Sequence, residues 1–264
     1  MSVFIDQTGK SITLNKAPQR IISLVPSQTE LLFDLGLDKE VRGITKFCVH
    51  PGKWLRSKTR VGGTKQVKME IIHQLQPDLI IANKEENIKE QIEELEKHYP
   101  VWVSDVNNLD DAYKMIKQVG IITTREQVAN DIILQIKQSF ATLPDGGSRL
   151  PAVYLIWQNP YMTIGGDTFI HAMLEAAGFK NMYAAKTRYP EITIQELQTI
   201  NPELLLLSSE PFPFKQKHAE EIKAQGIRVQ VAYADGEMFS WYGSRMLKAA
   251  SYFQKLYKEI IVNR

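Results

Sequence analysis

Two side chains that can hold a metal ion lie close together early in the chain. Cys48 is the single cysteine, and His50 follows two positions later. Thiolate and imidazole both bind soft and borderline metals, and Glu85 and Glu86 add carboxylate oxygens further along. A packed cysteine beside a surface histidine is the alternative. A metal chelate with an open coordination position of its own needs only one such ligand, for which His50 is the candidate.

Aromatic and polar side chains form a second set of candidates. Aromatic rings bind flat apolar ligands through contact area and stacking, while amide, carboxylate and guanidinium groups fix orientation. These groups follow predicted strands in the second half, although each could instead pack locally or lie on the surface. The candidate ligand contacts in this half are Trp157, Tyr161, Phe212, Asp235, Trp241 and Arg245.

Two segments of the first half offer polar groups. A glycine-rich turn over 60–65 contains Thr64, and its backbone N–H groups suit an anionic ligand edge or simply form a tight turn. Asn83 and Glu85 follow a predicted strand at the end where open α/β sheets bind ligands. The sequence contains no nucleophile, metallopeptidase or dinucleotide motif, which favours binding over catalysis.

The composition is that of a globular protein. The 264 residues are 44% hydrophobic and 23% charged, with a net charge of +2, which excludes disordered and collagen-like classes and gives no field for nucleic acid. A single cysteine excludes an intrachain disulfide. No apolar run reaches the roughly 18 residues of a membrane span. The first residues do not resemble a secretory signal, so we expect a cytoplasmic protein or a mature exported chain.

Short apolar runs alternate with helical patterns, which predicts an α/β fold with parallel sheets covered on both faces. The predicted strands are 20–25, 78–82, 101–104, 152–157, 204–208 and 228–233. The predicted helices are 28–36, 67–75, 86–97, 168–177, 193–200, 216–225 and 243–261.

An internal repeat indicates two related lobes. Residues 69–79 and 194–204 share a pattern of amphipathic helix, proline and buried strand at an offset of 125 residues. The segment between the lobes carries a helical pattern, which predicts one long helix or a helix pair ending in a turn cluster at 143–148. The predicted domains are therefore an N-terminal lobe at 1–108, a linking helix at 109–143 and a C-terminal lobe at 144–264. Small molecules often bind in a cleft between such lobes.

The opening segment 20–30 and the segment 75–82 resemble helical-backbone substrate-binding proteins of ABC importers, most closely the cobalamin-binding branch. The resemblance implies two Rossmann-like lobes joined by a long backbone helix, with a metal chelate in the cleft. Cobalamin or another corrinoid, a siderophore and haem are the implied ligands. It further implies no catalysis, no required cofactor, a periplasmic monomer and an ABC permease as partner.

The resemblance also assigns roles to individual residues. The matching aromatic residues are Phe47, Trp157, Tyr161, Tyr189 and Trp241, while Thr64 and Asn83 stand where cobalamin binders carry tryptophan. Glu70 matches the permease-docking glutamate of the first lobe. Gln195 stands at the second docking position, beside Glu196. The alternatives are a cytoplasmic corrinoid or metal-binding relative without a permease, and a metal-dependent enzyme using Cys48 and His50.

Overall fold

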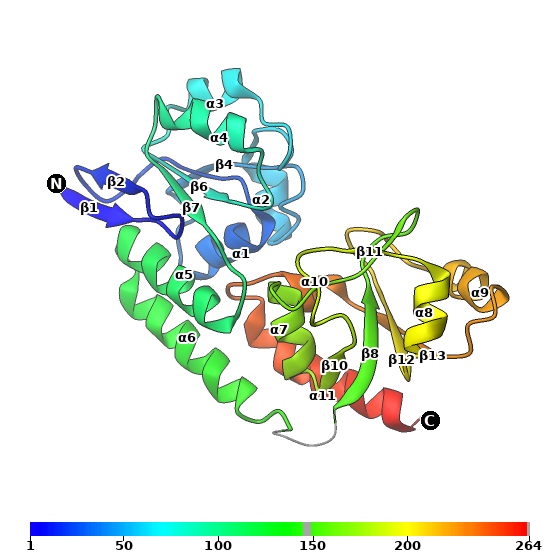
Figure 1. Cartoon of the computed structure of the whole chain (residues 1–264). Coiled ribbons are helices and arrows are strands. Elements are labelled where there is room, and N and C mark those ends of the chain that lie inside the picture. Colours follow the sequence, from blue (N-terminus) through cyan, green and yellow to red (C-terminus); the bar gives the residue numbers. More distant parts are fainter. Residues whose placement is uncertain (145–148, 263–264) are drawn as a thin grey trace. The chain divides into compact units, whose positions relative to one another are not determined.

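The computed structural model describes residues 1–144 and 149–262, and the chain divides into two units (Figure 1). The first unit comprises Met1–Val106, Asp110–Leu134 and Tyr242–Arg245, and the second comprises Asn107–Leu109, Gln135–Trp241 and Met246–Arg264. Each unit is built around its own parallel sheet. None of the described helices is long and apolar enough to cross a membrane.

The sheet of the first unit has five parallel strands in the order β5-β4-β3-β6-β7. These strands are β3 (Ile21–Ser23), β4 (Val41–Ile44), β5 (Thr59–Arg60), β6 (Leu79–Asn83) and β7 (Val101–Ser104). Its connecting helices are α1 (Pro26–Asp34), α2 (Gly52–Ser57), α3 (Met69–Leu75) and α4 (Lys89–Glu96). All residues of β6 and β7 are buried, because helices cover both faces of such a sheet.

The strand order reverses direction once in this sheet. From β3 the chain builds outward to β4 and β5, then returns to place β6 on the other side of β3. Such a switch point leaves a crevice at the carboxyl ends of the two central strands, where open α/β sheets bind ligands. Segments after β3 and β6 border this crevice in the first unit.

The sheet of the second unit has four parallel strands in the order β10-β8-β12-β13. Its strands are β8 (Leu150–Leu155), β10 (Phe179–Asn181), β12 (Leu204–Ser208) and β13 (Gln230–Ala234). Its helices are α7 (Phe169–Ala176), α8 (Ile194–Ile200), α9 (Gln216–Ala224), α10 (Gly236–Ser240) and α11 (Met246–Val262). The strand order reverses between β8 and β12, so the switch point of this sheet lies there.

Two small sheets lie outside this framework. The strands β1 (Ser2–Ile5) and β2 (Ser11–Leu14) form an antiparallel hairpin. Asp6 stabilises its turn, since Oδ1 accepts hydrogen bonds from the backbone N–H groups of Thr8 and Lys10 at 2.9 Å each. In the second unit, β9 (Tyr161–Met162) pairs antiparallel with β11 (Glu191–Ile192).

The linking segment contains a pair of helices, α5 (Leu109–Ile122) and α6 (Glu126–Phe140). Thr124, between them, has a φ of +57°, which helical backbone does not allow. A Cβ atom at Gly120 would lie 2.4 Å from the Cβ of Ala129, so glycine permits the close approach of the pair. The division between the units falls within α6, after Leu134.

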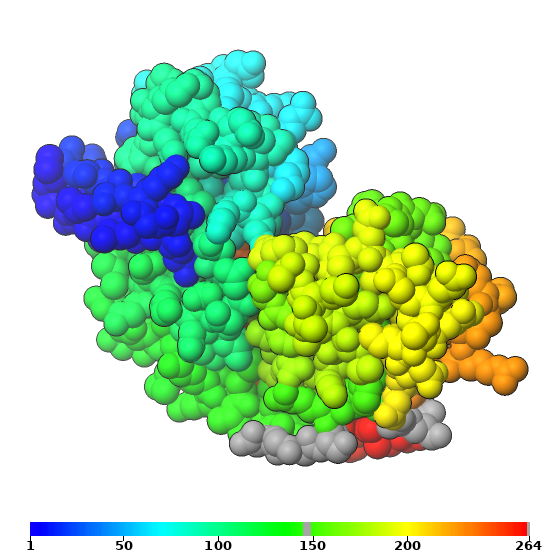
Figure 2. Space-filling model, viewed as in Figure 1, coloured from blue at the N-terminus to red at the C-terminus, as the bar shows by residue number. Residues whose placement is uncertain are grey.

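The internal repeat is present in three dimensions. Gln76 directly follows α3, and Asn201 directly follows α8, 125 residues later. Both residues adopt the left-handed conformation, with φ of +44° and +45°. Proline follows each, and a fully buried strand begins two residues after that proline. Helix α8 lies on the surface of its unit (Figure 2). Residues 145–148 of the predicted turn cluster lie outside the described residues.

Candidate functional site

The switch point of the second unit carries an aromatic pair, of which Trp157 is exposed and Phe212 partly buried. Trp157 follows β8 and keeps 40% of its surface exposed. Its ring meets Phe212, from the segment after β12, with centroids 5.7 Å apart and an interplanar angle of 66°. The backbone N–H of Phe212 donates to the carbonyl of Ile156 at 3.3 Å, which fixes this segment beside the end of β8. The two predicted residues therefore lie together.

A second layer of rings supports Phe212. Its ring centroid lies 4.8 Å from that of Phe214 and 5.1 Å from that of His218 on α9. Phe214 and His218 are buried, and Nδ1 of His218 accepts a hydrogen bond from the backbone N–H of Lys215 at 2.8 Å. The ring that contacts Trp157 is therefore itself held by packed side chains.

Other predicted residues of this unit lie nearby in the chain but make different contacts. Tyr161 begins β9 and is partly buried, and its hydroxyl lies 3.5 Å from the side-chain nitrogen of Gln158. Asp235 follows β13, and its Oδ1 accepts from the backbone N–H of Glu237 at 3.1 Å. Asp235 thus caps α10, and this cap uses one of its two carboxylate oxygens as a hydrogen-bond acceptor.

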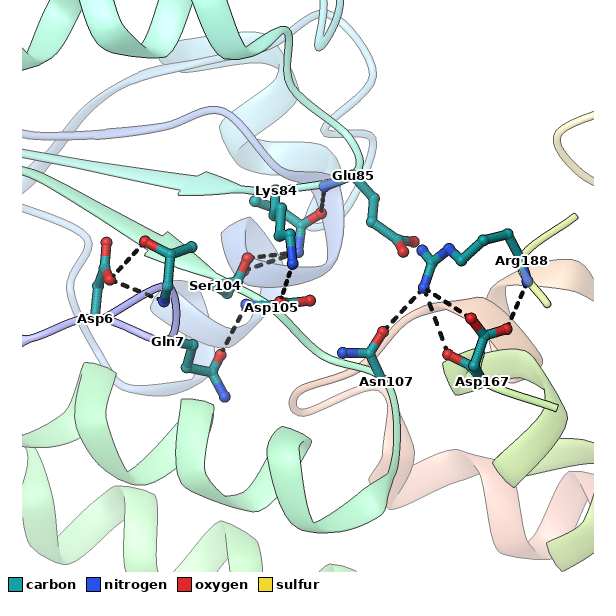
Figure 3. A network of polar contacts seen from close by, with 11 residues as sticks. Asp6, Gln7, Lys84, Glu85, Ser104, Asp105, Asn107, Asp167 and Arg188 are labelled. Atoms are coloured by element: carbon teal, nitrogen blue, oxygen red, sulfur yellow. Dashed lines mark hydrogen bonds and ion pairs between the residues drawn. The ribbon is translucent and has the colours of Figure 1, made fainter. Parts of the chain in front are cut away.

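Tyr189 lies beside Arg188, whose side chain contacts Asn107 and Asp167 (Figure 3). Arg188 has a φ of +57°, and its backbone N–H donates to Oδ1 of Asp167 at 2.5 Å. Its guanidinium lies 3.2 Å from Oδ1 of Asn107 and 5.5 Å from the ring centroid of Tyr189. These contacts hold the segment that carries Tyr189.

A carboxylate after β12 was not among the residues predicted from the sequence. Glu210 follows β12, and its Oε1 accepts hydrogen bonds from Ser240 Oγ at 2.7 Å and from the indole N–H of Trp241 at 2.9 Å. Burial, together with the charges of Glu237 and Asp235, raises the pKa of Glu210, although its two hydrogen bonds oppose that rise. Its place directly after a buried strand was the available signal.

Trp241 is therefore engaged within the protein. Only 8% of its surface is exposed, and its indole N–H is bonded to Glu210. A ring this buried presents little area to a ligand. The contact instead makes Trp241 a residue that positions the glutamate.

In the first unit, the predicted residues spread over the segments after β4, β5 and β6. Phe47 is 51% exposed, and the Lys46 ammonium lies 5.0 Å from its ring centroid. His50, Thr64 and Glu85 are all partly buried. Phe47 is thus a second large aromatic surface at a carboxyl-terminal sheet edge.

Asn83 organises the turn after β6. It is 3% exposed, and its side-chain oxygen accepts from the backbone N–H groups of Glu85 and Glu86 at 2.8 and 3.0 Å. Its Nδ2 donates to Oγ of Ser104 at 3.0 Å. In this turn, Lys84 extends to Asp105 on the next strand segment, with Nζ and Oδ2 2.5 Å apart (Figure 3). Asn83 therefore shapes the segment that presents Glu85.

Cys48 is fully buried. Its Sγ lies 3.0 Å from Oγ1 of Thr29 and 3.2 Å from Oγ1 of Thr45. Burial raises the pKa of the thiol, although these hydrogen bonds oppose the rise. Among residues 1–144 and 149–262, no three His, Cys, Asp or Glu side chains form a group that could hold a metal ion.

A segment from late in the chain occupies the switch point of the first unit. Residues 242–245 belong to this unit, and the hydroxyl of Tyr242 lies 3.2 Å from Oε1 of Glu86. A Cβ at Gly243 would lie 3.5 Å from the Ser27 carbonyl oxygen, at the start of α1. Nε of Arg245 lies 2.7 Å from Oε2 of Glu30, with side chains 6% and 8% exposed. The predicted ligand contact Arg245 is thus held in a buried ion pair.

The two predicted docking glutamates differ in their local contacts. Glu70 is exposed in the first turn of α3, where no side chain caps the helix. Glu196 is exposed in the first turn of α8, but its Oε2 accepts from the backbone N–H of Thr193 at 2.7 Å in a capping box. Its neighbour Gln195 is also exposed.

Comparison with known proteins gives the family context. Residues 21–232 match the model of a family described as periplasmic binding protein. The vitamin B12-binding protein of Vibrio campbellii is 25% identical over 199 residues, which span 74% of this chain and 72% of that protein.

Two solved structures show the same fold. A periplasmic haem-binding protein from Pseudomonas aeruginosa superposes with a TM-score of 0.79 at 19% identity, covering 91% of this chain and 93% of its own. A protein of an ABC-type Fe3+-hydroxamate transport system from Saccharomonospora viridis gives 0.74 at 20% identity, covering 97% and 98%. The predicted α/β fold with two parallel sheets is confirmed.

Proposed function

The chain belongs to the periplasmic binding protein family, and from this premise we propose that it captures a metal chelate for an ABC importer. The family consists of non-catalytic binding proteins, so the expectation that the chain is not an enzyme is confirmed. The proposed ligands are cobalamin or another corrinoid, haem, or a ferric siderophore, because relatives of this chain carry those names.

The aromatic pair of Trp157 and Phe212 at the switch point of the second unit carries this proposal. Trp157 presents a large ring at the carboxyl ends of parallel strands, and Phe212, Phe214 and His218 hold it in place. A tetrapyrrole or chelate face gains apolar contact area and stacking on such a ring. In the first unit, Phe47 provides a second exposed ring at the equivalent edge.

The remaining predicted contacts take supporting roles in this proposal. The remaining candidate ligand contacts are Tyr161, Tyr189, Thr64, Glu85, His50 and Asp235. Asn83, Trp241 and Arg245 act through the residues that they hold: the turn after β6, Glu210 and Glu30.

The partner and compartment follow from the family. We propose that the chain works as a monomer outside the cytoplasmic membrane and delivers its cargo to an ABC permease. Glu70 on α3 and Glu196 on α8 are the proposed docking carboxylates, since both are exposed in matching halves of the repeat. The metal site of Cys48 and His50 stays a prediction, and burial of the thiol disfavours the thiolate that such a site needs.

Ligand titration of the purified protein tests this function. Cyanocobalamin, haemin and ferrichrome are titrated by calorimetry and by quenching of tryptophan fluorescence, and we expect saturable 1:1 binding of at least one of them. Trp157→Ala should weaken that binding about tenfold or more, because a central aromatic contact contributes roughly 2 kcal/mol or more.

A control variant distinguishes loss of a ligand contact from a general effect of removing an aromatic side chain. Tyr99→Ala removes a ring just before β7, at the opposite, amino-terminal end of a strand, and should leave the affinity unchanged. In the absence of ligand, both variants should unfold in a transition as cooperative as that of the native chain. Failure of all three chelates to bind the native protein would contradict the proposed function.

A further inference from the structure

Glu210 is a hydrogen-bonded carboxylate close to the aromatic pair along the chain. It precedes Phe212 by two residues, in the segment that follows β12. The switch point of the second sheet lies between β8, which leads to Trp157, and β12, which leads to Glu210. The ring and the carboxylate thus follow the two strands that flank this switch point, where open α/β sheets bind ligands.

The contacts of this carboxylate are asymmetric. Oε1 accepts hydrogen bonds from both Ser240 and Trp241, at 2.7 and 2.9 Å. Oε2 has no hydrogen-bond partner among the described residues and is not sealed from solvent. The side chain is therefore held in one orientation with one oxygen available to a ligand.

The backbone around Glu210 is equally constrained. The hydroxyl of Ser208 donates to the carbonyl of Glu210 at 2.6 Å and accepts from its N–H at 3.3 Å. A Cβ atom at Gly236 would lie 2.4 Å from Cγ of Glu210, so glycine is required where α10 meets this side chain. These contacts restrict movement of the carboxylate when a ligand binds.

Two further carboxylates act on Glu210 with like charge. Asp235 and Glu237, on the segment that begins α10, act on it with like charge and, together with burial, raise its pKa. A partly desolvated carboxylate surrounded by like charge gains most from a hydrogen-bond donor and loses most from a further anion.

We infer that Glu210 is a specificity-determining residue, which selects chelates that present N–H or O–H donors at this edge and rejects chelates that present carboxylates there. This inference rests on the proposed function, since it narrows the class of chelate that the protein captures. An ionised carboxylate only accepts hydrogen bonds, and leaving it desolvated and unpaired is costly. Amide-bearing corrinoids and hydroxamate chelates with amide N–H groups fit this requirement, whereas haem and citrate chelates carry carboxylates.

Four chelates test the inference on the full chain at pH 7.5. Cyanocobalamin and ferrichrome supply donors, while haemin and ferric citrate supply carboxylates. We expect the native protein to bind a donor chelate at least tenfold more tightly than either carboxylate chelate. Glu210→Gln should weaken the donor chelate about tenfold or more, the range for a hydrogen bond to a charged group, and strengthen the carboxylate chelates.

Glu237→Gln is the matched control, because it removes one negative charge from the same edge and leaves Glu210 in place. It should change the affinities much less than Glu210→Gln does. Equal effects of the two variants would overturn the inference, because the general field would then be responsible. Tightest binding of haemin by the native protein, unchanged in Glu210→Gln, would overturn the inference and leave the proposed function intact. No binding of any chelate would contradict the proposed function itself.

Discussion

Burial decides the chemistry of Cys48 at the scale of the single residue. The thiol is sealed in the first unit beside Thr29 and Thr45, and burial raises its pKa. We expect no measurable reaction with a disulfide reagent at pH 8 in the native protein, and one equivalent of reaction in denaturant, because only the thiolate attacks. Absorbance of the released thiol gives the rate.

The same residue tests the predicted metal site. Elemental analysis of the native protein and of Cys48→Ala should give the same metal content. Rapid labelling of the native thiol, or a metal atom present in the native protein and lost in Cys48→Ala with His50 unchanged, would show that the pair binds metal after all. Elemental analysis of His50→Ala, which removes the second predicted ligand, a partly buried side chain, would then test whether the histidine binds the same metal.

The candidate residues also show which roles the sequence can predict. Trp157 and Phe212 each follow an apolar strand, and the two rings contact each other there. Their role as ligand contacts stays a prediction. The contacts of Asn83, Trp241 and Arg245 are set by partners that lie 21, 31 and 215 residues away. Their type and local pattern suggested ligand contacts, because nothing nearby in the sequence indicates Ser104, Glu210 or Glu30 as partners.

At the scale of elements, strongly apolar segments were predictable and weakly patterned ones were not. The buried strands β6, β7, β8 and β12 follow near-continuous apolar runs. Strand β4 contains Arg42 and Gly43, and it is a strand because it pairs between β3 and β5. The break between α5 and α6 carries no glycine or proline at 123–125, and packing of Gly120 against Ala129 accompanies it.

Helices α3 and α8 differ in how their first turns are stabilised, which gives a pH-dependent prediction. Hydrogen bonds from Thr193 lower the pKa of Glu196. A carboxyl group with a lowered folded-state pKa stabilises the protein above its unfolded pKa, and the effect disappears as the pH falls through the folded value. Glu196→Ala should therefore lower the urea midpoint at pH 7 and have progressively less effect below about pH 4.5.

Glu70 is the matched position in the other half of the repeat. Because no side chain caps α3, Glu70→Ala should leave the urea midpoint nearly unchanged at pH 7. Neither substitution should alter chelate affinity, because both side chains are exposed and neither is among the candidate ligand contacts. A loss of stability in Glu70→Ala equal to that in Glu196→Ala would contradict the capping argument.

At the scale of the whole molecule, the path of the chain couples the two units. The first unit is completed by residues 242–245, which lie between helices α10 and α11 of the second. Arg245 is anchored there by the buried ion pair with Glu30. Unfolding of the second unit would release both ends of this segment and weaken its ion pair, so the two units should unfold together. We expect a single calorimetric transition for the native chain.

Substitution of the buried pair tests that coupling. Removing one partner leaves an uncompensated buried charge and costs about 3–5 kcal/mol, so Arg245→Met should lower the free energy of unfolding by that amount and divide the transition in two. Adding Glu30→Gln removes the stranded charge, so the double variant should regain part of the stability. An unchanged single transition in Arg245→Met would mean that α6 alone couples the units. Equal losses in the single and double variants would show that side-chain packing, and not the paired charges, gives the segment its hold on the first unit.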